Sequence, residues 1–222
     1  MSTFNDEEKR QIIRAFYIPF LLVYVMWLIK TIEWLWGISF ATWGINPRTI
    51  SGLTGILLSP LLHADWGHLV SNTVPLVVLT AAIAYFYKPI AIKILVIIWL
   101  VTGICVWITG RNAYHIGASS LIYGEAAFVF FSGVIRRSIT LLSIALLTVF
   151  LYGGMIWGIF PFYIKISWES HLFGGITGTV LAFVYRNEGP KAEEKVWEEE
   201  PDDNPYWETS EEETPDSRQL LN

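Results

Sequence analysis

Long uncharged, apolar stretches alternate along this chain with short polar segments. Six such stretches occur, at residues 15–29, 67–87, 94–110, 112–135, 138–164 and 170–185. Glu125 is the one charged residue within these stretches. Arg14 and Lys30 lie at the two ends of the first stretch. About 20 apolar residues cross the hydrocarbon core of a bilayer as a helix, and basic side chains at helix ends can reach the headgroups. The pattern therefore predicts an all-α membrane protein with a bundle of six transmembrane helices.

Basic residues predict the orientation of this bundle. If the N-terminus lies in the cytoplasm, ten Lys and Arg residues flank the inner ends of the spans and four flank the outer ends. The outer four are Lys30, Arg48, Arg111 and Lys165. Lys and Arg accumulate in cytoplasmic loops, so both termini are expected on the cytoplasmic side. The first ten residues are acidic and show no signal-peptide pattern, and no organelle-targeting segment is visible. We expect a multi-pass protein of the cell (inner) membrane, with another membrane left open.

The amino-acid composition agrees with a membrane protein and distinguishes an acidic C-terminal tail from the rest of the chain. Hydrophobic residues make up 53% of the chain and charged residues 16%, against roughly a quarter charged in a typical soluble domain. Residues 187–222 carry 13 acidic and three basic side chains, a net charge of −10, whereas the other 186 residues carry 12 basic and seven acidic ones, a net charge of +5. The Glu- and Pro-rich composition of residues 187–222 predicts disorder. We expect a cytoplasmic segment at 1–10, a membrane domain at 11–186 and an acidic tail at 187–222.

Polar residues inside a membrane are costly, so each is a functional hypothesis. His68 and Asn72 are four residues apart and share a helix face, as do Ser119 and Tyr123. His171 opens the last apolar stretch. Taken singly, such residues have ordinary roles, because His and Asn link helices, an isolated Ser bonds its own backbone and Tyr packs in a core.

Two stripes of small residues predict which helices approach each other. Gly117, Ser120 and Gly124 form one, and Gly174 or Gly175 with Gly178 forms the other. Small residues let helix backbones come close, so the fourth and sixth helices are expected to pack together. That packing would bring His171 toward Ser119. His68, Ser119 and His171 each lie about five to eight residues inside the outer start of a span, which predicts one shared layer roughly 8–12 Å below the outer surface.

These residues, in this order, resemble the rhomboid family of intramembrane serine proteases. His63 with His68-x-x-x-Asn72 is similar to the family's second-span motif, and Gly117-x-Ser119-x-x-x-Tyr123-Gly124 is similar to its nucleophile motif. The last span of the family is matched by His171-x-x-Gly174-x-x-x-Gly178, and its first external loop by residues 44–56. Ser120 departs from the family pattern, which has Gly there, but its small side chain is expected to preserve the helix contact.

The chemistry expected of these residues is acyl transfer by a Ser–His dyad. A Ser hydroxyl needs an adjacent base, and His is the suitable base near neutral pH. We expect His171 to take the proton of Ser119, with the Asn72 amide, the His68 ring and the Ser119 backbone N–H as candidate oxyanion donors. The resemblance assigns His68 and Asn72 to that role and implies that Tyr123 stacks beneath His171.

The same resemblance includes His63, Gly117, Gly174 and Gly178 as supporting positions. No third, carboxylate member is expected, because the only aspartate outside the terminal segments, Asp65, precedes the second span. No metal or other cofactor and no nucleic acid is expected. Transmembrane segments of other proteins, with a helix-weak portion, would be the substrates, and the resemblance implies that they enter sideways.

Three further features complete these expectations. Residues 160–163 between the last two spans form either a lid over the site or an interfacial aromatic belt. Arg48 is expected to orient the first external loop at the headgroups. Glu125 is given no catalytic role and no assigned partner, and the oligomeric state, the substrate and the role of the tail stay open.

Other classes of function remain as alternatives. A transporter or channel would use His68, Glu125 and His171 as a proton path and would not need Ser119. A non-proteolytic, client-binding rhomboid relative need not keep both Ser119 and His171. Metal-dependent and aspartyl intramembrane proteases require His-Glu-x-x-His or aspartates within spans, and this chain has neither.

Overall fold

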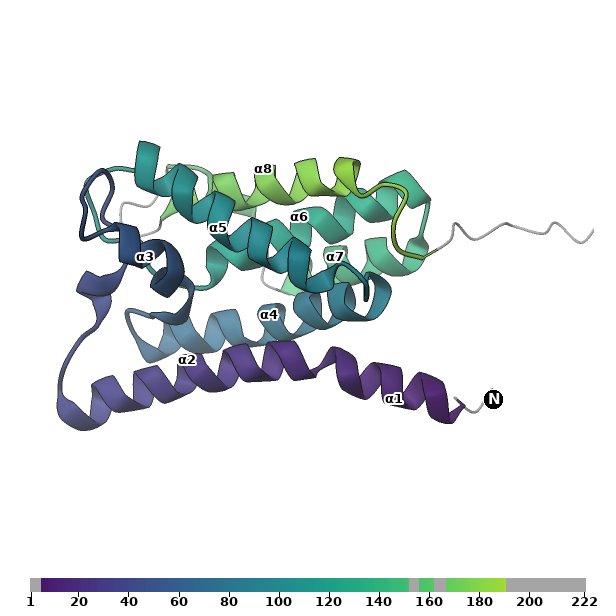
Figure 1. The fold of residues 1–222 in the computed structure, drawn as a ribbon, viewed down its shortest axis with the longest axis horizontal. Helices are drawn as coiled ribbons and strands as arrows, with labels where there is room; N and C mark the ends of the chain where they lie inside the picture. Colours follow the sequence, from purple (N-terminus) through teal and green to yellow (C-terminus); the bar gives the residue numbers. More distant parts are fainter. Residues whose placement is uncertain (1–4, 152–155, 162–166, 191–222) are drawn as a thin grey trace, which may run out of the picture. The chain divides into compact units, whose positions relative to one another are not determined.

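A computed structural model describes residues 5–151, 156–161 and 167–190 of the chain. All of them belong to one compact unit, residues 1–192, and they contain helices and loops but no strand (Figure 1). The all-α architecture expected from the sequence is therefore confirmed. The predicted disorder of the acidic tail concerns residues that, from 191 onward, lie outside the described part of the chain.

The described residues form eight α-helices and three short 3₁₀-helices, joined by loops. The α-helices are α1 (Asp6–Ala15), α2 (Tyr17–Trp36), α3 (Leu53–Leu58), α4 (Trp66–Phe86), α5 (Ala91–Thr109), α6 (Ser119–Arg136), α7 (Ile139–Leu151) and α8 (Trp168–Val184). The 3₁₀-helices are η1 (Ala41–Trp43), η2 (Ser59–Leu61) and η3 (Ile156–Ile159). Among these residues, three segments are long and apolar enough to cross a membrane: Asp6–Trp36, α4 and α5. Helix α7 is apolar but shorter.

Helix α1 was not predicted, although the sequence signals its start. Asn5 accepts hydrogen bonds from the backbone N–H groups of Glu7 and Glu8, and the Glu8 side chain accepts from the Asn5 N–H. This reciprocal pair is a capping box, which satisfies backbone donors that a helix start leaves free. Helix α2 follows directly, so the first apolar stretch is the second part of a 31-residue helical segment.

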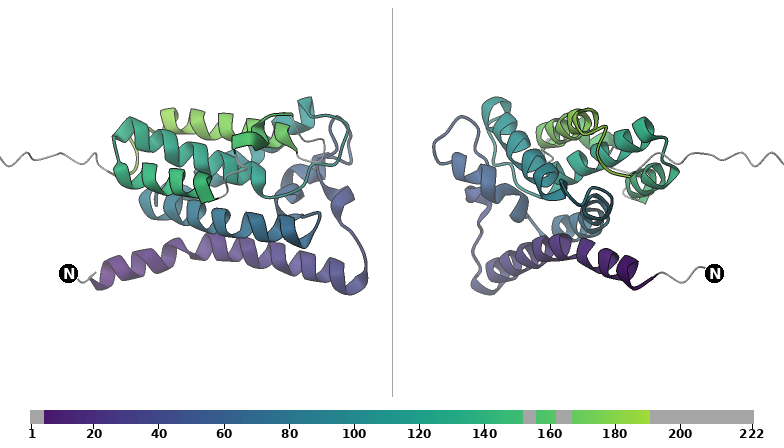
Figure 2. Two further views of the ribbon diagram at one scale, coloured as in Figure 1. Left: turned by 180° about the vertical axis from the view of Figure 1, so that it is seen from behind. Right: turned by 45° about the vertical axis from the view of Figure 1, so that its right-hand side comes forward.

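Helix α6 occupies the centre of the bundle. It packs against α4, α5, α7 and α8, and its contact with α8 is the most extensive between any two described elements (Figures 1 and 2). Leu121, Phe128 and Val129 of α6 are almost fully buried among these neighbours. Helices α1 and α2 lie along the outside of α4.

Glycines explain how closely α6 and α8 approach. A methyl group on Gly178 would overlap the carbonyl of Gly124, and one on Gly174 would overlap the carbonyl of Ser120. Gly175, by contrast, has no atom within 4 Å of where its methyl group would be. The predicted packing of α6 against α8 is confirmed, with Gly174 rather than Gly175 at the contact. Gly117, which was assigned to the same stripe, precedes α6 and lies against His68 of α4 instead.

The structure shows a hydrogen-bond partner for Glu125, to which the sequence assigned none. Its side chain is completely buried, and Thr80 Oγ1 of α4 lies 2.6 Å from its Oε1. Its second oxygen has no partner among the described residues. Burying a carboxyl group is costly unless it is hydrogen-bonded, so this bond ties α4 to α6 deep in the bundle.

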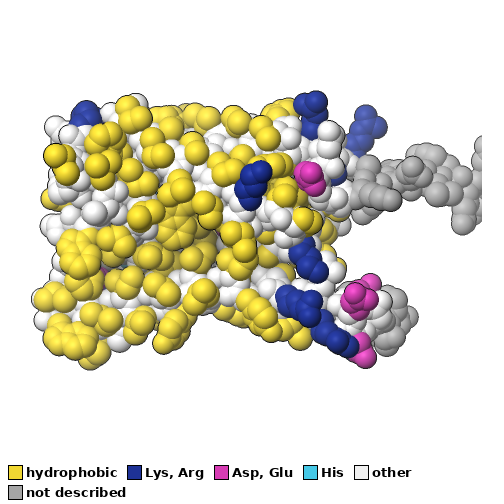
Figure 3. All heavy atoms as spheres, viewed as in Figure 1, with side chains coloured by type: hydrophobic (Ala, Val, Ile, Leu, Met, Phe, Trp, Pro, Cys, Tyr) yellow, Lys and Arg dark blue, Asp and Glu magenta, His cyan; other side chains and the backbone are white. Residues whose placement is uncertain are grey.

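The surface of the bundle is mainly hydrophobic. Figure 3 shows yellow side chains over most of one face, with Lys and Arg side chains gathered at the end of the bundle that holds the N-terminus. Exposed aromatic residues include Trp34, Trp36, Trp43 and Phe150. Large exposed apolar areas on a chain with helices of membrane-crossing length indicate contact with lipid.

Gly178→Ala is expected to lower the free energy of unfolding by about 1–3 kcal/mol, because the added methyl group forces α8 away from the Gly124 carbonyl. Gly175→Ala, on the same helix but facing open space, is the matched control and is expected to leave stability unchanged or slightly higher. Unfolding of the purified variants in detergent measures both values. Equal stability of the two variants would contradict this account of the helix contact.

Candidate active site

The predicted nucleophile and base lie in contact. His171 Nε2 is 2.8 Å from Ser119 Oγ, a normal hydrogen-bond distance between side chains of α6 and α8. Ser119 is the first residue of α6 and His171 lies in the first turn of α8. Ser119 is partly accessible, whereas His171 is buried. Since the two residues are 52 positions apart, the close packing of α6 and α8 is what brings them together.

The orientation of the His171 ring is set by a backbone carbonyl. His171 Nδ1 lies 2.8 Å from the carbonyl oxygen of Gly158 in η3, so Nδ1 carries the proton and donates it. Nε2 is then unprotonated and accepts from the Ser119 hydroxyl. The sequence offered no signal for Gly158, because a main-chain oxygen can come from any residue.

Tyr123 supports the same ring from one face. The rings of Tyr123 and His171 stack with centroids 4.1 Å apart and planes within 4° of parallel. A methyl group on Gly158 would collide with Tyr123 and approach within 2.9 Å of His171 Nδ1. A glycine is therefore required at position 158 for the carbonyl, the imidazole and the phenol to fit together.

His68 and Asn72 of α4 lie against Gly117, two residues before Ser119. Asp65 caps α4 by accepting the His68 N–H at 2.8 Å, which fixes the first turn of that helix. Gly117 has φ +113, and a methyl group on it would lie 2.6–2.7 Å from the His68 ring. The Asn72 side chain is buried and its Nδ2 has no hydrogen-bond partner among the described residues. Two donors from α4 thus lie next to the loop that leads into Ser119.

His63 connects the segment before α4 to that loop. Its ring lies edge-on to the His68 ring, with centroids 5.0 Å apart, and its Nε2 accepts the Ala118 N–H at 3.4 Å. Burial, with the adjacent His68 adding to it, lowers the pKa of His63 to about 3, so the ring is neutral and can accept this bond. Lys30 of α2 holds the His63 carbonyl at 3.0 Å while paired with Glu33 at 2.9 Å.

The loop before Ser119 is fixed by hydrogen bonds along its length. His115 and Ile45 exchange backbone hydrogen bonds, and the Gly117 N–H donates to the Ser59 carbonyl at 2.8 Å. Arg48 binds the Gly110 carbonyl and the Asn112 side chain, each at 2.7 Å, and so links the segment before α3 to the loop before α6. Its expected place at the headgroups stays a prediction. Buried polar groups in a non-helical segment must be paired, and this loop satisfies that requirement.

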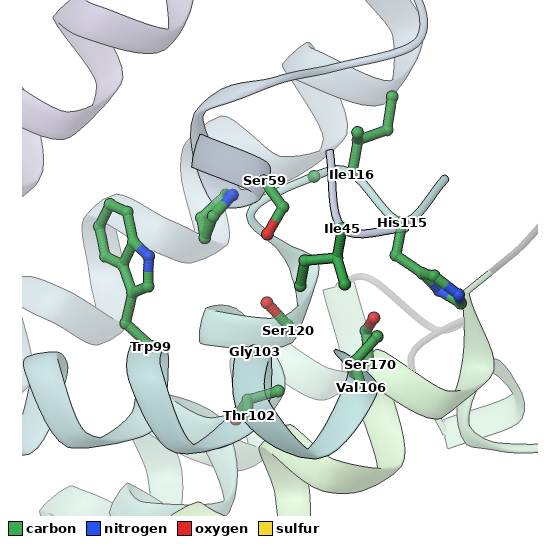
Figure 4. A pocket seen from close by; sticks show the side chains of 12 residues that line it. Ile45, Ser59, Trp99, Thr102, Gly103, Val106, His115, Ile116, Ser120 and Ser170 are labelled. Atoms are coloured by element: carbon green, nitrogen blue, oxygen red, sulfur yellow. The ribbon is translucent and has the colours of Figure 1, made fainter. Parts of the chain in front are cut away.

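A small polar pocket lies beside this loop. Figure 4 shows it between η2, α5 and the start of α6, with the hydroxyl groups of Ser59 and Ser120 pointing toward each other across it. Thr102 also lines it, and its buried hydroxyl has no partner among the described residues. Ser120 therefore turns its side chain to the pocket and its carbonyl to Gly174, so the α6–α8 contact survives the replacement of Gly, as expected.

The structure corrects one expectation about position. His68, Ser119 and His171 do not lie five to eight residues inside helices but in the first turns of α4, α6 and α8. The uncharged stretches include loop residues such as 112–118, and hydropathy does not distinguish a buried loop from a helix. Residues 162 and 163 of the segment considered as a lid lie outside the described residues, while Phe160 is 42% exposed.

Several residues near the site were not predicted to belong to it. Besides Gly158, they are Lys30, Glu33, Ser167 and Glu169. Glu33 and Glu169 are only 5% and 4% exposed, although both lie near helix ends where acidic residues are normally solvated. Among the described residues, no group of three or more His, Cys, Asp or Glu side chains has the arrangement of a metal site.

Comparisons with known proteins place these features in a family. Residues 51–188 match the model of the Rhomboid domain. Uncharacterized proteins of Mycobacterium bovis and Mycobacterium tuberculosis are each 34% identical over 171 residues, which cover 73% of this chain and 71% of theirs. An uncharacterized protein of Mycobacterium leprae is 32% identical over 195 residues, 83% of this chain and 76% of its own. The chain is therefore a membrane protein that belongs to the rhomboid family.

Proposed function

We propose that this protein is an intramembrane serine endopeptidase in which Ser119 is the nucleophile and His171 the general base. The observation that carries the proposal is the 2.8 Å contact between His171 Nε2 and Ser119 Oγ, with Nδ1 committed to the Gly158 carbonyl. The Rhomboid domain match supports it, since that family includes proteases. A serine outside such a pair would have no base to activate it.

The proposed reaction follows from this geometry. His171 Nε2 takes the hydroxyl proton as Ser119 Oγ attacks the carbonyl carbon of a substrate peptide bond. The tetrahedral intermediate collapses when His171 returns that proton to the leaving amine, which leaves an acyl group on Ser119. Water, deprotonated by His171, then attacks the acyl group on Ser119, and the second product is released as His171 returns the proton to Ser119 Oγ. Gly158 holds the ring in one orientation throughout.

The negative charge of the intermediate requires donors near Ser119. The candidates are Asn72 Nδ2, which has no partner in the described part of the chain, the His68 ring and the backbone N–H of Ser119. Ser119 is also the first residue of α6, and the N-terminus of a helix carries partial positive charge. Donors that are fixed before the reaction and partly shielded from water stabilise an oxyanion most effectively.

The membrane arrangement belongs to the same proposal. Helices α6, α7 and α8 would be the fourth, fifth and sixth spans, and both termini would lie in the cytoplasm. The gathering of Lys and Arg side chains at the end of the bundle that holds the N-terminus supports this orientation. The first turns of α4, α6 and α8 would then face the outer leaflet, where water can reach Ser119. The substrate would be a transmembrane segment with a weakly helical portion, since a stable helix keeps its carbonyls hydrogen-bonded.

Ser119→Ala and His171→Ala are each expected to abolish cleavage of a tagged single-span substrate by the purified protein in detergent. Ser119 of the wild type is also expected to react with a fluorophosphonate probe, and the His171→Ala variant is expected to react at least a hundredfold more slowly. Thr179→Val, which removes a hydroxyl group that donates to the Gly175 carbonyl within α8, is the matched control. Cleavage that persists in both dyad variants would rule out this mechanism.

Asn72→Ala is expected to lower kcat about 10- to 100-fold and to change KM little, because the amide would act on the transition state rather than on the bound substrate. Ser71→Ala alters the exposed neighbouring residue of α4 and is expected to leave kcat unchanged. Steady-state kinetics with a fluorogenic single-span substrate separate the two parameters. A wild-type kcat in Asn72→Ala would remove the amide from the oxyanion site.

A periplasmic alkaline phosphatase reporter is expected to be active when fused after Ile38 and silent when fused after Arg137 or Asn222. Ile38 follows the first span on the proposed outer side, whereas the other two positions lie on the proposed inner side. Reporter activity normalised to expression in bacterial cells gives the measurement. Activity at either of the last two positions would overturn the proposed orientation.

A further inference from the structure

We propose that His115 and Ser167 form a clamp that positions the Ser119–His171 pair, so that both are positioning residues for the proposed reaction. This inference rests on the proposed function, because it takes Ser119 and His171 to be the catalytic dyad. The clamp itself rests on contacts that lie outside the dyad.

The clamp is a second Ser–His pair, and each of its residues lies four positions before a residue of the dyad. His115 precedes Ser119 by four residues, and Ser167 precedes His171 by four residues. His115 Nδ1 and Ser167 Oγ form a hydrogen bond, as Ser119 and His171 do, but here the His lies in the segment before α6 and the Ser in the segment that begins α8. The loop before α6 and the start of α8 are therefore joined at two matching positions.

A complete chain of donors and acceptors surrounds the clamp. His115 Nε2 lies 3.1 Å from the Arg111 carbonyl, so Nε2 carries the proton and Nδ1 accepts from the Ser167 hydroxyl. Ser170 Oγ lies 2.6 Å from Ser167 Oγ and donates to it. Burial lowers the pKa of His115, which keeps the ring in this neutral, accepting form. His115 and His171 therefore require opposite tautomers, with the proton on Nε2 in one and on Nδ1 in the other.

Ser167 links the His115 contact directly to the backbone of His171. It is the N-cap residue of α8, where a Ser hydroxyl ordinarily bonds the free N–H groups of the first turn. Among the described residues the hydroxyl makes no such bond, and it binds His115 and Ser170 instead. Its carbonyl accepts the His171 N–H at 3.3 Å. Fixing Ser167 therefore fixes the helix turn that carries the imidazole.

The other end of the clamp is held just as firmly. His115 is 2% exposed and exchanges two backbone hydrogen bonds with Ile45. The charged groups that face it are Arg111 and Glu169, and Arg111 pairs with Glu169 across the same gap at 3.7 Å. Three contacts, Arg111–Glu169, His115–Ser167 and Ser119–His171, thus link residues 111–119 to residues 167–171. A clamp of this kind holds Oγ and Nε2 in range, and a small loss of alignment between reacting groups is costly to the rate.

Four variants test the clamp. Ser167→Ala removes the hydroxyl, and Ser167→Thr keeps it. His115→Asn keeps an acceptor near the position of Nδ1, whereas His115→Gln keeps a donor near the position of Nε2 but loses the bond to Ser167. We expect Ser167→Ala and His115→Gln to lower kcat about five- to tenfold, the effect of one buried hydrogen bond, with KM within twofold of wild type.

Ser167→Thr and His115→Asn are expected to retain at least a third of the wild-type kcat. The double variant Ser167→Ala with His115→Gln is expected to lose no more than the more affected single variant, because both changes remove one interaction. The rate of Ser119 labelling by a fluorophosphonate should follow the same order, and Thr179→Val is again the matched control. Wild-type rates in Ser167→Ala, or equal losses in His115→Asn and His115→Gln, would overturn the clamp.

A second measurement is independent of proteolysis. The chain has four histidines, so ¹⁵N-histidine NMR in detergent can assign the tautomer of each ring. We expect a single Nδ1–H form of His171 in the wild type and in Thr179→Val, and a mixture of forms in Ser167→Ala. An unchanged His171 spectrum in Ser167→Ala would refute the clamp even if the protein were inactive. Conversely, a wild type that neither cleaves nor labels, with the spectral change present, would refute the proposed function and leave the clamp standing.

Discussion

The close approach of α6 and α8 is the constraint on which the candidate site depends. The two helices carry one member each of the Ser119–His171 pair, and a hydrogen bond of 2.8 Å tolerates little change in their separation. Gly174 and Gly178 allow this separation because each faces a backbone carbonyl of α6. In a membrane, where apolar burial does not drive helices together, such backbone-level packing is a main source of helix association. The same small residues therefore account for the packing of the two helices and for the contact between the Ser119 hydroxyl and the His171 imidazole.

A second constraint concerns the chain that leads into α6. Residues 110–118 are not helical, yet His115, Gly117 and Ala118 are almost fully buried. Backbone polar groups in such a place need partners within the protein. They find them in Ile45, Ser59 and the His63 ring, all in the segment between α2 and α4. That segment is thus a scaffold for the loop, and Arg48, Lys30 and Glu33 hold the scaffold in turn.

Sequence reasoning reached the features that follow from side-chain type and spacing. The apolar stretches predicted α4 and α5 to within a few residues, and the glycine stripes predicted which helices meet. It failed where the deciding group is the backbone or a tertiary contact. The Gly158 carbonyl, the Thr80 partner of Glu125 and the bond between His115 and Ser167 link positions 13 to 52 residues apart, and nothing local marks them. The start of α6 was missed for a related reason, because an uncharged loop buried by its neighbours has the hydropathy of a helix.

The use of a carbonyl in place of a carboxylate has an energetic consequence for the proposed dyad. In a Ser–His–Asp arrangement the carboxylate both orients the imidazole and stabilises the imidazolium that forms as the proton moves. The Gly158 carbonyl accepts the Nδ1–H at 2.8 Å and so provides the orientation, but it carries no net charge. Part of the missing stabilisation can come from the face of the Tyr123 ring, 4.1 Å from the imidazole, because an aromatic face attracts a cation. With less charge stabilisation available, more of the rate must come from alignment, which is why contacts that hold the loop before Ser119 against the start of α8 matter more in a dyad than in a triad.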